Sequence, residues 1–244
     1  MIIKSLTEIQ NIKESSIICS AALANIATLL RPGLTTLQLD AIIHAFIVDN
    51  GGTPSFLNYG GFPFASCIAV NDAIVHGAPN ARILVEGDIV SIDVGVLKNG
   101  FHGDQAYTFC IGEGTSDDMH LINTTKMALL KGILTAKVGN RIGDIGYAIS
   151  NYISDNELMV IKDFAGHAIG TSLHEDPLVP NFGAKGKGKL LKENTTFAIE
   201  PIVSTTNDFF IDSDNWTYRT GNAAVAAHFE HTIVITENGY KILT

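Results

Sequence analysis

Two histidines, His167 and His174, stand seven positions apart in the segment GHAIGTSLHEDP, residues 166–177. The glycines and the proline of this segment oppose a helix, and in a straight strand an odd spacing places two side chains on opposite faces. The spacing therefore favours different tasks for the two rings, one as a metal ligand and the other held beside it. A structural role in the core is the alternative interpretation of each.

Two aspartates lie on either side of the strongest hairpin signal in the chain, the Asn-Gly pair at 99–100. If these two residues form the whole loop, Asp104 pairs with Gly95, and Asp93 pairs with Ala106. Residues two apart in a strand share a face, so Asp93 and Asp104 become diagonal neighbours on one face, with backbones about 7–8 Å apart. A longer, bulged turn would change this register.

Two glutamates, Glu200 in FAIEPIV and Glu230 in HFEHTIVIT, also stand inside apolar, strand-like sequence. Each of the four carboxylates could simply face solvent from a half-exposed strand. Clustered and buried, however, they would repel one another or take up protons, and two divalent cations would cancel their charge. Oxygen ligands with one imidazole favour manganese, iron(II) or cobalt, with zinc as an alternative ion. They do not resemble a structural zinc site. No His-Glu-x-x-His motif is present.

Helices and strands that could position these side chains follow from caps and periodicity. Ser5-x-x-Glu8 and Thr35-x-x-Gln38 predict capping boxes that open two helices, which end at 31–33 and at 51–52. Further helices are predicted near 117–138 and 142–154. Strands are predicted in the runs SCIAV, DIVSIDVGVL, FHGDQAYTFCIG, NTTFAIEPIV and AAHFEHTIVIT. The order of elements indicates an α+β fold.

A weak internal repeat links the two halves of the chain. At an offset of 106 residues, segment 21–50 aligns with 127–156, and the matches include Gly33 with Gly139 and Asn50 with Asn156. Two related halves that fold onto each other would explain the repeat. No Pro/Ser-rich linker divides the chain, so one domain over residues 1–244 is predicted.

Composition excludes several classes of protein. No apolar run reaches membrane-spanning length, and glutamates near the amino terminus are wrong for a secretory leader. The three cysteines form no disulfide framework, so a reducing cytoplasm is expected. The net charge of −9 argues against nucleic acid as the main partner. The string GAKGKGKL at 183–190 lacks the Ser or Thr of a P-loop and is interpreted as a solvated basic loop.

Five motifs, taken in order, resemble the motif series of methionine aminopeptidase. They are NDAIVHG (71–77), SIDVGVLKNGFHGD (91–104), GHAIGTSLHEDP (166–177), FAIEP (197–201) and HFEHTIVIT (228–236). The resemblance implies the pita-bread fold, a curved, mainly antiparallel sheet flanked by helices in two pseudo-symmetric halves. It also implies removal of the initiator methionine when the second residue is small, with a metal-bridged water or hydroxide attacking the first peptide bond.

Site residues carried over from the motifs form a dinuclear centre and a substrate pocket. Asp93 would hold one metal, His174 and Glu200 the other, and Asp104 and Glu230 would bridge both. Glu200 would also accept the proton of the water, and His76 and His167 would be catalytic residues on the substrate side. The methionine pocket would be lined by Tyr59, Phe62, Cys67, Leu173 and Trp216.

Three positions depart from the family pattern. Family members commonly carry aromatic residues where this chain has Phe62 and Leu173, and a glycine where it has Ala168. The first two changes are expected to reshape the pocket, and the third to alter the local backbone. None of the three is a predicted metal ligand.

The resemblance further implies the short type I form, because only 25 residues separate His174 from Glu200. The implied partners are nascent polypeptides with an amino-terminal methionine, with the ribosome as a candidate. No nucleic-acid substrate and no membrane are expected, and the chain is expected to be a cytoplasmic monomer. The alternatives are an Xaa-Pro-specific aminopeptidase or dipeptidase of the same fold, whose relatives usually carry an extra amino-terminal domain, and a non-catalytic peptide-binding relative.

Overall fold

The computed structural model describes all residues, 1–244, as a mixture of helices and antiparallel sheets, which is the predicted α+β class. The helices are α1 (Leu6–Leu29), α2 (Thr36–Asp49), α3 (Ser116–Thr135), α4 (Ile142–Asp155) and the 3-10 helix η1 (Tyr59–Gly61). The strands are β1 (Thr53–Pro54), β2 (Cys67–Val70), β3 (Ala73–Val75), β4 (Ile89–Lys98), β5 (Phe101–Cys110), β6 (Met159–Val160), β7 (Ala165–Ala168), β8 (Glu175–Pro180), β9 (Thr196–Ile199), β10 (Ile202–Ser204), β11 (Phe209–Ile211), β12 (Tyr218–Thr220), β13 (Ala226–His228), β14 (His231–Thr236) and β15 (Gly239–Ile242).

Both predicted capping boxes are present at the helix starts. The Ser5 hydroxyl accepts a hydrogen bond from the Glu8 N–H, and the Glu8 carboxylate accepts one from the Ser5 N–H. Thr35 and Gln38 make the same reciprocal pair at the start of α2. These bonds satisfy N–H groups that the first turn of a helix leaves free. No helix is both long enough and apolar enough to cross a lipid bilayer.

The internal repeat corresponds to two equivalent helix pairs. α2 and α4 are both 14 residues long and are offset by the predicted 106 positions, and the ends of α1 and α3 have the same offset. Gly33 and Gly139 both have a positive φ, 96° and 90°, a conformation open to glycine. Asn50 and Asn156 are the C-cap residues of α2 and α4, respectively. The two halves therefore share one local design.

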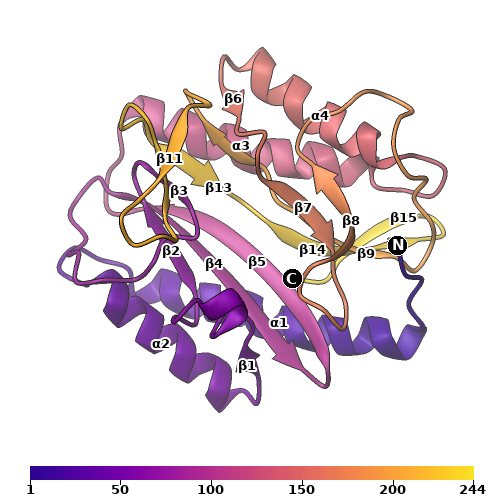
Figure 1. Ribbon diagram of the computed structural model, residues 1–244, viewed down its shortest axis with the longest axis horizontal. Coiled ribbons are helices and arrows are strands. Elements are labelled where there is room, and N and C mark those ends of the chain that lie inside the picture. Colours follow the sequence, from indigo (N-terminus) through magenta and orange to yellow (C-terminus); the bar gives the residue numbers. More distant parts are fainter.

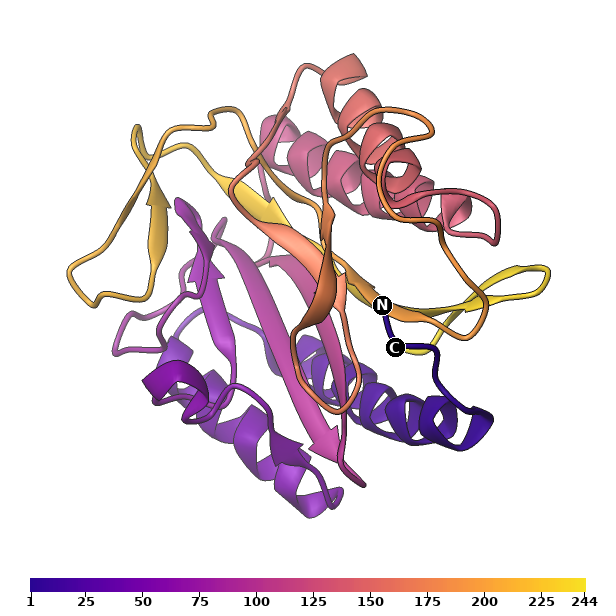
Figure 2. The same ribbon diagram turned by 45° about the vertical axis from the view of Figure 1, so that its right-hand side comes forward.

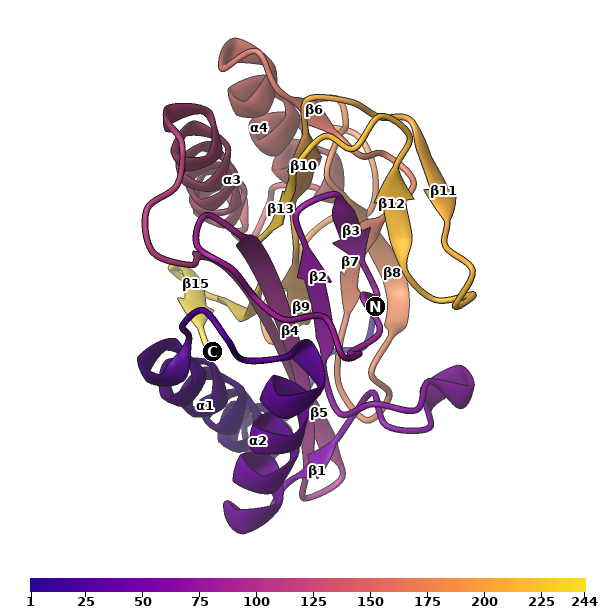
Figure 3. The same ribbon diagram turned by 90° about the vertical axis from the view of Figure 1, so that its left-hand side faces the viewer.

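The sheets lie between and beside the helix pairs. One sheet has the order β1-β4-β2, with β5 paired to β4, and a five-stranded sheet has the order β15-β14-β9-β7-β8. The β4–β5 hairpin crosses the centre of the molecule, with α1 and α2 below it and α3 and α4 above (Figure 1). Seen from the side, all four helices lie to one side of the central strands, and β8, β11 and β12 lie to the other (Figure 3). None of the four α-helices covers the second face of the sheets, and a site can form there between the central strands and the segments that contain β8, β11 and β12.

Each helix pair covers a hydrophobic core of its own. Sixteen buried residues from α1, α2 and the strands of the first half form one cluster, and 23 form the other, largely beneath α3 and α4. Tyr107 on β5 packs against both. The turned view shows the strands of the two halves running side by side between the helix pairs (Figure 2).

The hairpin at 99–100 has the predicted two-residue loop. Asp104 pairs with Gly95 and Asp93 pairs with Ala106 in the β4–β5 ladder. Asn99 and Gly100 both have a positive φ, as the tight hairpin turn requires. The register prediction is confirmed, and with it the placement of the two aspartates on one face.

The two glutamate-bearing runs, predicted as continuous strands, are each divided in two. NTTFAIEPIV forms β9 and β10, which belong to different sheets, and AAHFEHTIVIT forms β13 and β14 in the same two sheets. Pro201 follows Glu200 and has no N–H to donate to a ladder. The two breaks lie together, since the Phe229 N–H donates to the Pro201 carbonyl over 3.3 Å. Glu200 and Glu230 therefore stand where the chain crosses between sheets.

Residues 183–190 are an exposed loop, as predicted for the basic string GAKGKGKL. The Gly186 N–H donates to the Asp144 carboxylate on α4 over 2.7 Å, which holds the loop against the surface. The lysine side chains are exposed.

Candidate metal centre

A cavity of about 260 Å³ gathers all twelve of the predicted site residues. The acidic and histidine members come from both halves of the chain, and the apolar members come mainly from the loops at the cavity mouth. The lining residues are Phe56, Tyr59, Gly60, Phe62, Cys67, His76, Asp93, Asp104, His167, Leu173, His174, Glu200, Trp216 and Glu230. The structure therefore brings the predicted set together, although the role of each residue stays a prediction.

Asp93 and Asp104 form the floor of the cavity on the β4–β5 hairpin. The Asp104 side chain is 3% exposed. Its backbone N–H donates to the Thr232 hydroxyl over 3.0 Å, and its carbonyl accepts from the same hydroxyl over 2.8 Å. Cys67 on β2 lies directly opposite Asp93 in the ladder. The aspartates are thus held by regular sheet structure and by one cross-sheet hydroxyl.

Glu200 and Glu230 reach the same place from the two strand breaks. The Glu230 N–H donates to the Ala106 carbonyl of β5 over 3.0 Å, and the side chain is 2% exposed. The Asn181 side-chain amide donates to the Glu200 carbonyl over 2.9 Å. Each break frees the glutamate from the alternation of a strand, so its side chain can turn toward the aspartates.

The four carboxyl groups share one cavity without enough partners, with Asp104 and Glu230 buried and Asp93 and Glu200 partly exposed. Oδ1 of Asp93, Oδ1 of Asp104 and Oε1 of Glu230 are buried and have no hydrogen-bond partner. Burial raises the pKa of Asp104 to about 7. Burial, and then the charges of the neighbouring carboxylates, raise the pKa values of the other three well above their usual range. A bound cation would reverse both effects.

His167 lies among these carboxylates. The residue is on β7 and is 3% exposed. Three possible ligand atoms, one from each of His167, Asp104 and Glu230, lie within 4.8 Å of one another. Its Nδ1 lies 3.1 Å from the Ala168 carbonyl, which can only accept, so Nδ1 carries the proton. Burial lowers the pKa of His167 to about 3, so the ring is neutral. Its Nε2 therefore presents a lone pair to Oε1 of Glu200, 3.6 Å away.

His174 occupies a different position from the one expected of a ligand. Its ring is exposed, it belongs to neither of the two trios of closely spaced ligand atoms, and its Nδ1 lies 2.7 Å from the Tyr59 hydroxyl. The centroids of the His174 and His167 rings are 4.3 Å apart. The geometry thus favours exchanging the two sequence-based assignments, with His167 as the ligand and His174 on the substrate side.

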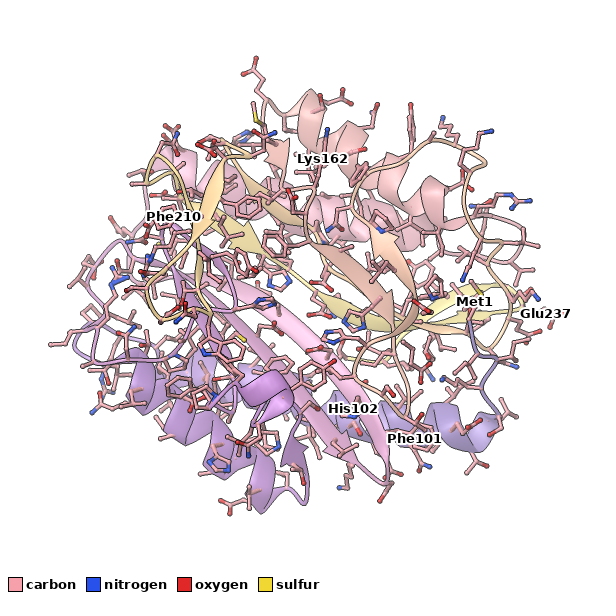
Figure 4. All side chains as sticks on the ribbon, viewed as in Figure 1. Met1, Phe101, His102, Lys162, Phe210 and Glu237 are labelled. Atoms are coloured by element: carbon pink, nitrogen blue, oxygen red, sulfur yellow. The ribbon has the colours of Figure 1, made fainter.

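The segment before β8 that carries His174 is fixed at both of its ends. The His102 N–H, near the start of β5 (Figure 4), donates to the Gly170 carbonyl over 2.8 Å. Glu175 accepts from the Thr171 N–H and forms a buried ion pair with Lys4, 2.6 Å from Nζ to Oε2. The ring of His174 is therefore placed by the backbone on either side and by Tyr59.

The cavity wall opposite the carboxylates is apolar. Phe56, Phe62, Cys67, Ile169 and Leu173 form a buried cluster against which Trp216 packs. The Phe62 and Trp216 rings meet edge to face with centroids 5.3 Å apart. Trp216 lies in the loop between β11 and β12, where Asp214 accepts from its N–H over 2.8 Å. Phe62 and Leu173, the two departures in this wall, are buried here.

His76 follows β3 with a positive φ of 52°, which is uncommon outside glycine. Its ring meets the ring of Tyr218 edge to face, with centroids 5.7 Å apart. Burial lowers the pKa of His76, and His174 lowers it further. The backbone conformation turns this imidazole from the end of the strand into the cavity.

Comparison with known proteins agrees with the geometry. Residues 10–237 match the sequence model of Metallopeptidase family M24. The chain belongs to this family. It is 43% identical to methionine aminopeptidase 1 of Bacillus subtilis over 88% of this chain and 87% of that protein, and 41% identical to methionine aminopeptidase of Clostridium acetobutylicum over 100% and 98%.

Solved structures of M24 enzymes show the same fold. The crystal structure of methionine aminopeptidase from Rickettsia prowazekii superposes with a TM-score of 0.98 at 34% identity, covering 100% of this chain and 99% of that one. The predicted resemblance to methionine aminopeptidase and the predicted pita-bread fold are confirmed. A prolidase from Pyrococcus furiosus has a TM-score of 0.80 at 22% identity, covering 100% of this chain and 65% of that one, and shows a shared fold alone.

The residues of this M24 chain are suited to divalent metal ions. Nε2 of His167 and Oε1 of Glu200 face each other with lone pairs, an unfavourable contact unless a cation or a proton lies between them. Carboxylate oxygens of Asp93, Asp104 and Glu230 are buried without a partner, and Asp104 and Glu230 each place an oxygen within 4.8 Å of a His167 ring nitrogen. Hard oxygen donors with one neutral imidazole are the ligand type that divalent first-row metals accept. Divalent metal binding, a property of the family, thus fits the donors of this chain.

One residue near the cavity was missed in the sequence. His228 is 3% exposed, and its Nε2 lies 3.5 Å from Oε2 of Glu200. A second trio of ligand atoms, from Glu200, His228 and Glu230, lies within 4.8 Å. The only signal was in the run AAHFEHTIVIT, where His228 and Glu230 would share a face if the strand were continuous; in the structure the strand ends at His228.

The raised carboxyl pKa values predict how stability depends on pH once metal is removed by a chelator. Carboxyl groups in an unfolded chain titrate near pH 4, so the folded state binds more protons up to about pH 7, where Asp104 titrates, and above it, where the other three titrate. The free energy of unfolding therefore falls as pH rises over this range. The lowered pKa values of buried histidines such as His167, His228 and His231 oppose this trend below about pH 6.5. The fall is therefore expected between pH 6.5 and 8.

Urea unfolding of chelated protein at several pH values measures this effect directly. Protein loaded with Mn(II) serves as the control and is expected to lose the fall, because the cations replace the protons. A free energy of unfolding that rises with pH over this interval in the chelated protein would contradict the burial of the carboxylates.

Proposed function

We propose that residues 1–244 form one catalytic domain that removes the initiator methionine from nascent polypeptides when the second residue is small. The observation that carries this proposal is the cavity itself, which is lined by four clustered carboxylates, two of them buried, and by an apolar wall beside them. This arrangement supports a hydrolytic centre beside a slot for an apolar side chain. The relatives named methionine aminopeptidase, about 40% identical over nearly the whole chain, support the same conclusion.

The metal ligands in this proposal are Asp93, Asp104, His167, Glu200 and Glu230. Asp93 would serve one ion, His167 and Glu200 the other, and Asp104 and Glu230 would be shared between the two. His167 replaces His174 in this set because it lies with Asp104 and Glu230, whereas His174 is exposed and bonded to Tyr59. Cobalt, manganese or iron(II) suit these donors, with zinc as an alternative.

The chemistry divides between the ions and the side chains. When bound, the metal ions polarise a carbonyl and lower the pKa of water. Glu200 accepts the proton of the attacking water and passes it to the departing amine, as a general base and then a general acid. His76 and His174 line the cavity beside the carboxylates, where they can orient the peptide and donate hydrogen bonds to the oxygen that becomes negative in the transition state.

The residues of the apolar wall would select methionine by binding its side chain. Phe62, Cys67, Leu173 and Trp216 are packed against one another on one side of the carboxylates, and the exposed Tyr59 stands at the entrance. An unbranched thioether side chain is flexible enough to fill such a slot.

The cellular setting follows from the same assignment. We propose a type I enzyme that acts in the cytoplasm as a monomer on chains emerging from the ribosome, with no nucleic acid as substrate and no membrane as partner. The net charge of −9 is consistent with a peptide substrate rather than a polyanion.

A tripeptide panel tests the proposed function. With Mn(II) added, methionine is expected to be released from Met-Ala-Ser with kcat/KM about 100-fold or more above that for Met-Leu-Ser and Leu-Ala-Ser, since each substitution alters one subsite. Preferential cleavage of Ala-Pro would favour the Xaa-Pro dipeptidase alternative. Binding of Met-Ala-Ser without cleavage in the presence of metal would favour a non-catalytic relative.

A further inference from the structure

His228 is a buried imidazole whose backbone is fixed. Its N–H donates to the Thr108 hydroxyl of β5 over 3.0 Å, and its carbonyl accepts from that hydroxyl over 2.7 Å. It pairs with Ile202 of β10, two residues after Glu200. The residue therefore cannot move away from Glu200 without breaking both bonds to β5.

The His228 ring points its Nε2 atom toward the Glu200 carboxylate. Its Nε2 is buried, has no hydrogen-bond partner, and lies 3.5 Å from Oε2 of Glu200. On the other side of the same carboxylate, Nε2 of His167 lies 3.6 Å from Oε1. Glu200 thus stands between two imidazoles, one facing each of its oxygens.

Three roles are open to such a ring: a space-filling one, direct metal binding, or orientation of Glu200. A purely space-filling role is opposed by the unpartnered Nε2, since an apolar side chain would avoid the cost of burying it. Direct metal binding is opposed by position. Glu200 and Glu230 line the cavity but His228 does not, so an ion in the cavity meets the carboxylates first.

We propose that His228 is a positioning residue for Glu200. In its neutral form with the proton on Nε2, it donates a hydrogen bond to Oε2 of Glu200 once the two atoms close by about 0.5 Å. This bond fixes the rotation of the carboxylate and leaves Oε1 turned toward His167 and the cavity. The inference rests on the proposed function, in which Glu200 binds a metal ion.

Two substitutions of similar volume separate the three roles. H228Q keeps an N–H donor but removes the imidazole, and H228L keeps the packing but removes the donor. Mn(II) is titrated calorimetrically into chelator-treated protein, and thermal unfolding checks that each variant is folded. H228L is expected to bind one of the two ions about 10–100-fold more weakly, as loss of a partner to a ligand usually causes, whereas H228Q is expected to stay within about threefold of the wild type.

Each other outcome overturns the proposal in a recognisable way. Equal weakening in H228Q and H228L would identify His228 as a metal ligand, and wild-type affinity in H228L would identify it as space-filling. If H228L does not fold, a tenfold loss of affinity in H228Q alone is enough to overturn it. A wild-type protein that takes up no Mn(II) would instead refute the proposed function on which the inference rests.

Discussion

Glu230→Gln is expected to lower kcat/KM by roughly a thousandfold or more and, at the same time, to stabilise the chelated protein. Glu230 is 2% exposed and is a proposed bridge between both ions. Its replacement weakens both metal sites, and the chemistry they supply is worth several kcal/mol in the transition state, with each 1.36 kcal/mol equal to a tenfold change in rate.

The gain in stability comes from removing a negative charge that is costly to bury when no metal is bound. Burial and three neighbouring carboxylates raise the pKa of Glu230 well above its usual range, which means that the ionised form is costly in the folded protein. A glutamine has nearly the same shape and no charge, so the free energy of unfolding of chelated protein at pH 8 should rise by about 1–3 kcal/mol. Function and stability are expected to move in opposite directions at this residue.

Glu237→Gln is the matched control, because Glu230 and Glu237 stand directly before and directly after β14. Glu237 is exposed in the turn to β15 at the edge of the molecule (Figure 4). Glu237→Gln is expected to leave three quantities unchanged: the free energy of unfolding in urea, the Mn(II) affinity measured by calorimetry, and the rate of methionine release from Met-Ala-Ser. If Glu230→Gln kept normal metal affinity, or destabilised the chelated protein, the proposed crowding of charges on the cavity floor would be wrong.

Local signals in the sequence predicted the elements that they control directly. Capping side chains opened the first two helices at the expected residues, and Asn99-Gly100 set the β4–β5 register on which Asp93 and Asp104 depend. A turn or a cap involves residues a few positions apart, so its chemistry can be read without knowing the fold. The repeat was equally accessible, because both helix pairs kept the same spacing.

Features that depend on distant segments were not predictable in the same way. Pro201 is a local sign of the break after Glu200, but the run that contains Glu230 looks continuous in sequence, and only the pairing of its two parts with different sheets shows the break there. His228 looked like part of a strand until the fold placed it against Glu200. The roles of His167 and His174 depend on burial and on which other ligand atoms lie near each ring, neither of which spacing reveals.

That pair of histidines carries the second large expected effect. Nδ1 of His167 is bonded to a backbone carbonyl, which leaves Nε2 as a lone pair directed at Glu200. Nδ1 of His174 is bonded to the Tyr59 hydroxyl in an exposed position. A metal ligand needs a free lone pair among the other ligands and a partner that fixes the ring, and both conditions are met together at His167.

His167→Ala is therefore expected to lose one of the two Mn(II) ions and to lower kcat by about a thousandfold, since an emptied site also removes its share of the catalysis. His174→Ala is expected to keep both ions, with affinities within about threefold of the wild type, while kcat falls by about 10²–10³ through loss of a donor to the transition state. His44→Ala, on the exposed face of α2, should change neither the metal content nor kcat.

Metal content after gel filtration, measured together with kcat on Met-Ala-Ser, distinguishes the two histidines. Loss of metal from His174→Ala with retention in His167→Ala would restore the assignment suggested by the motifs and reject the one based on burial and on the nearby ligand atoms.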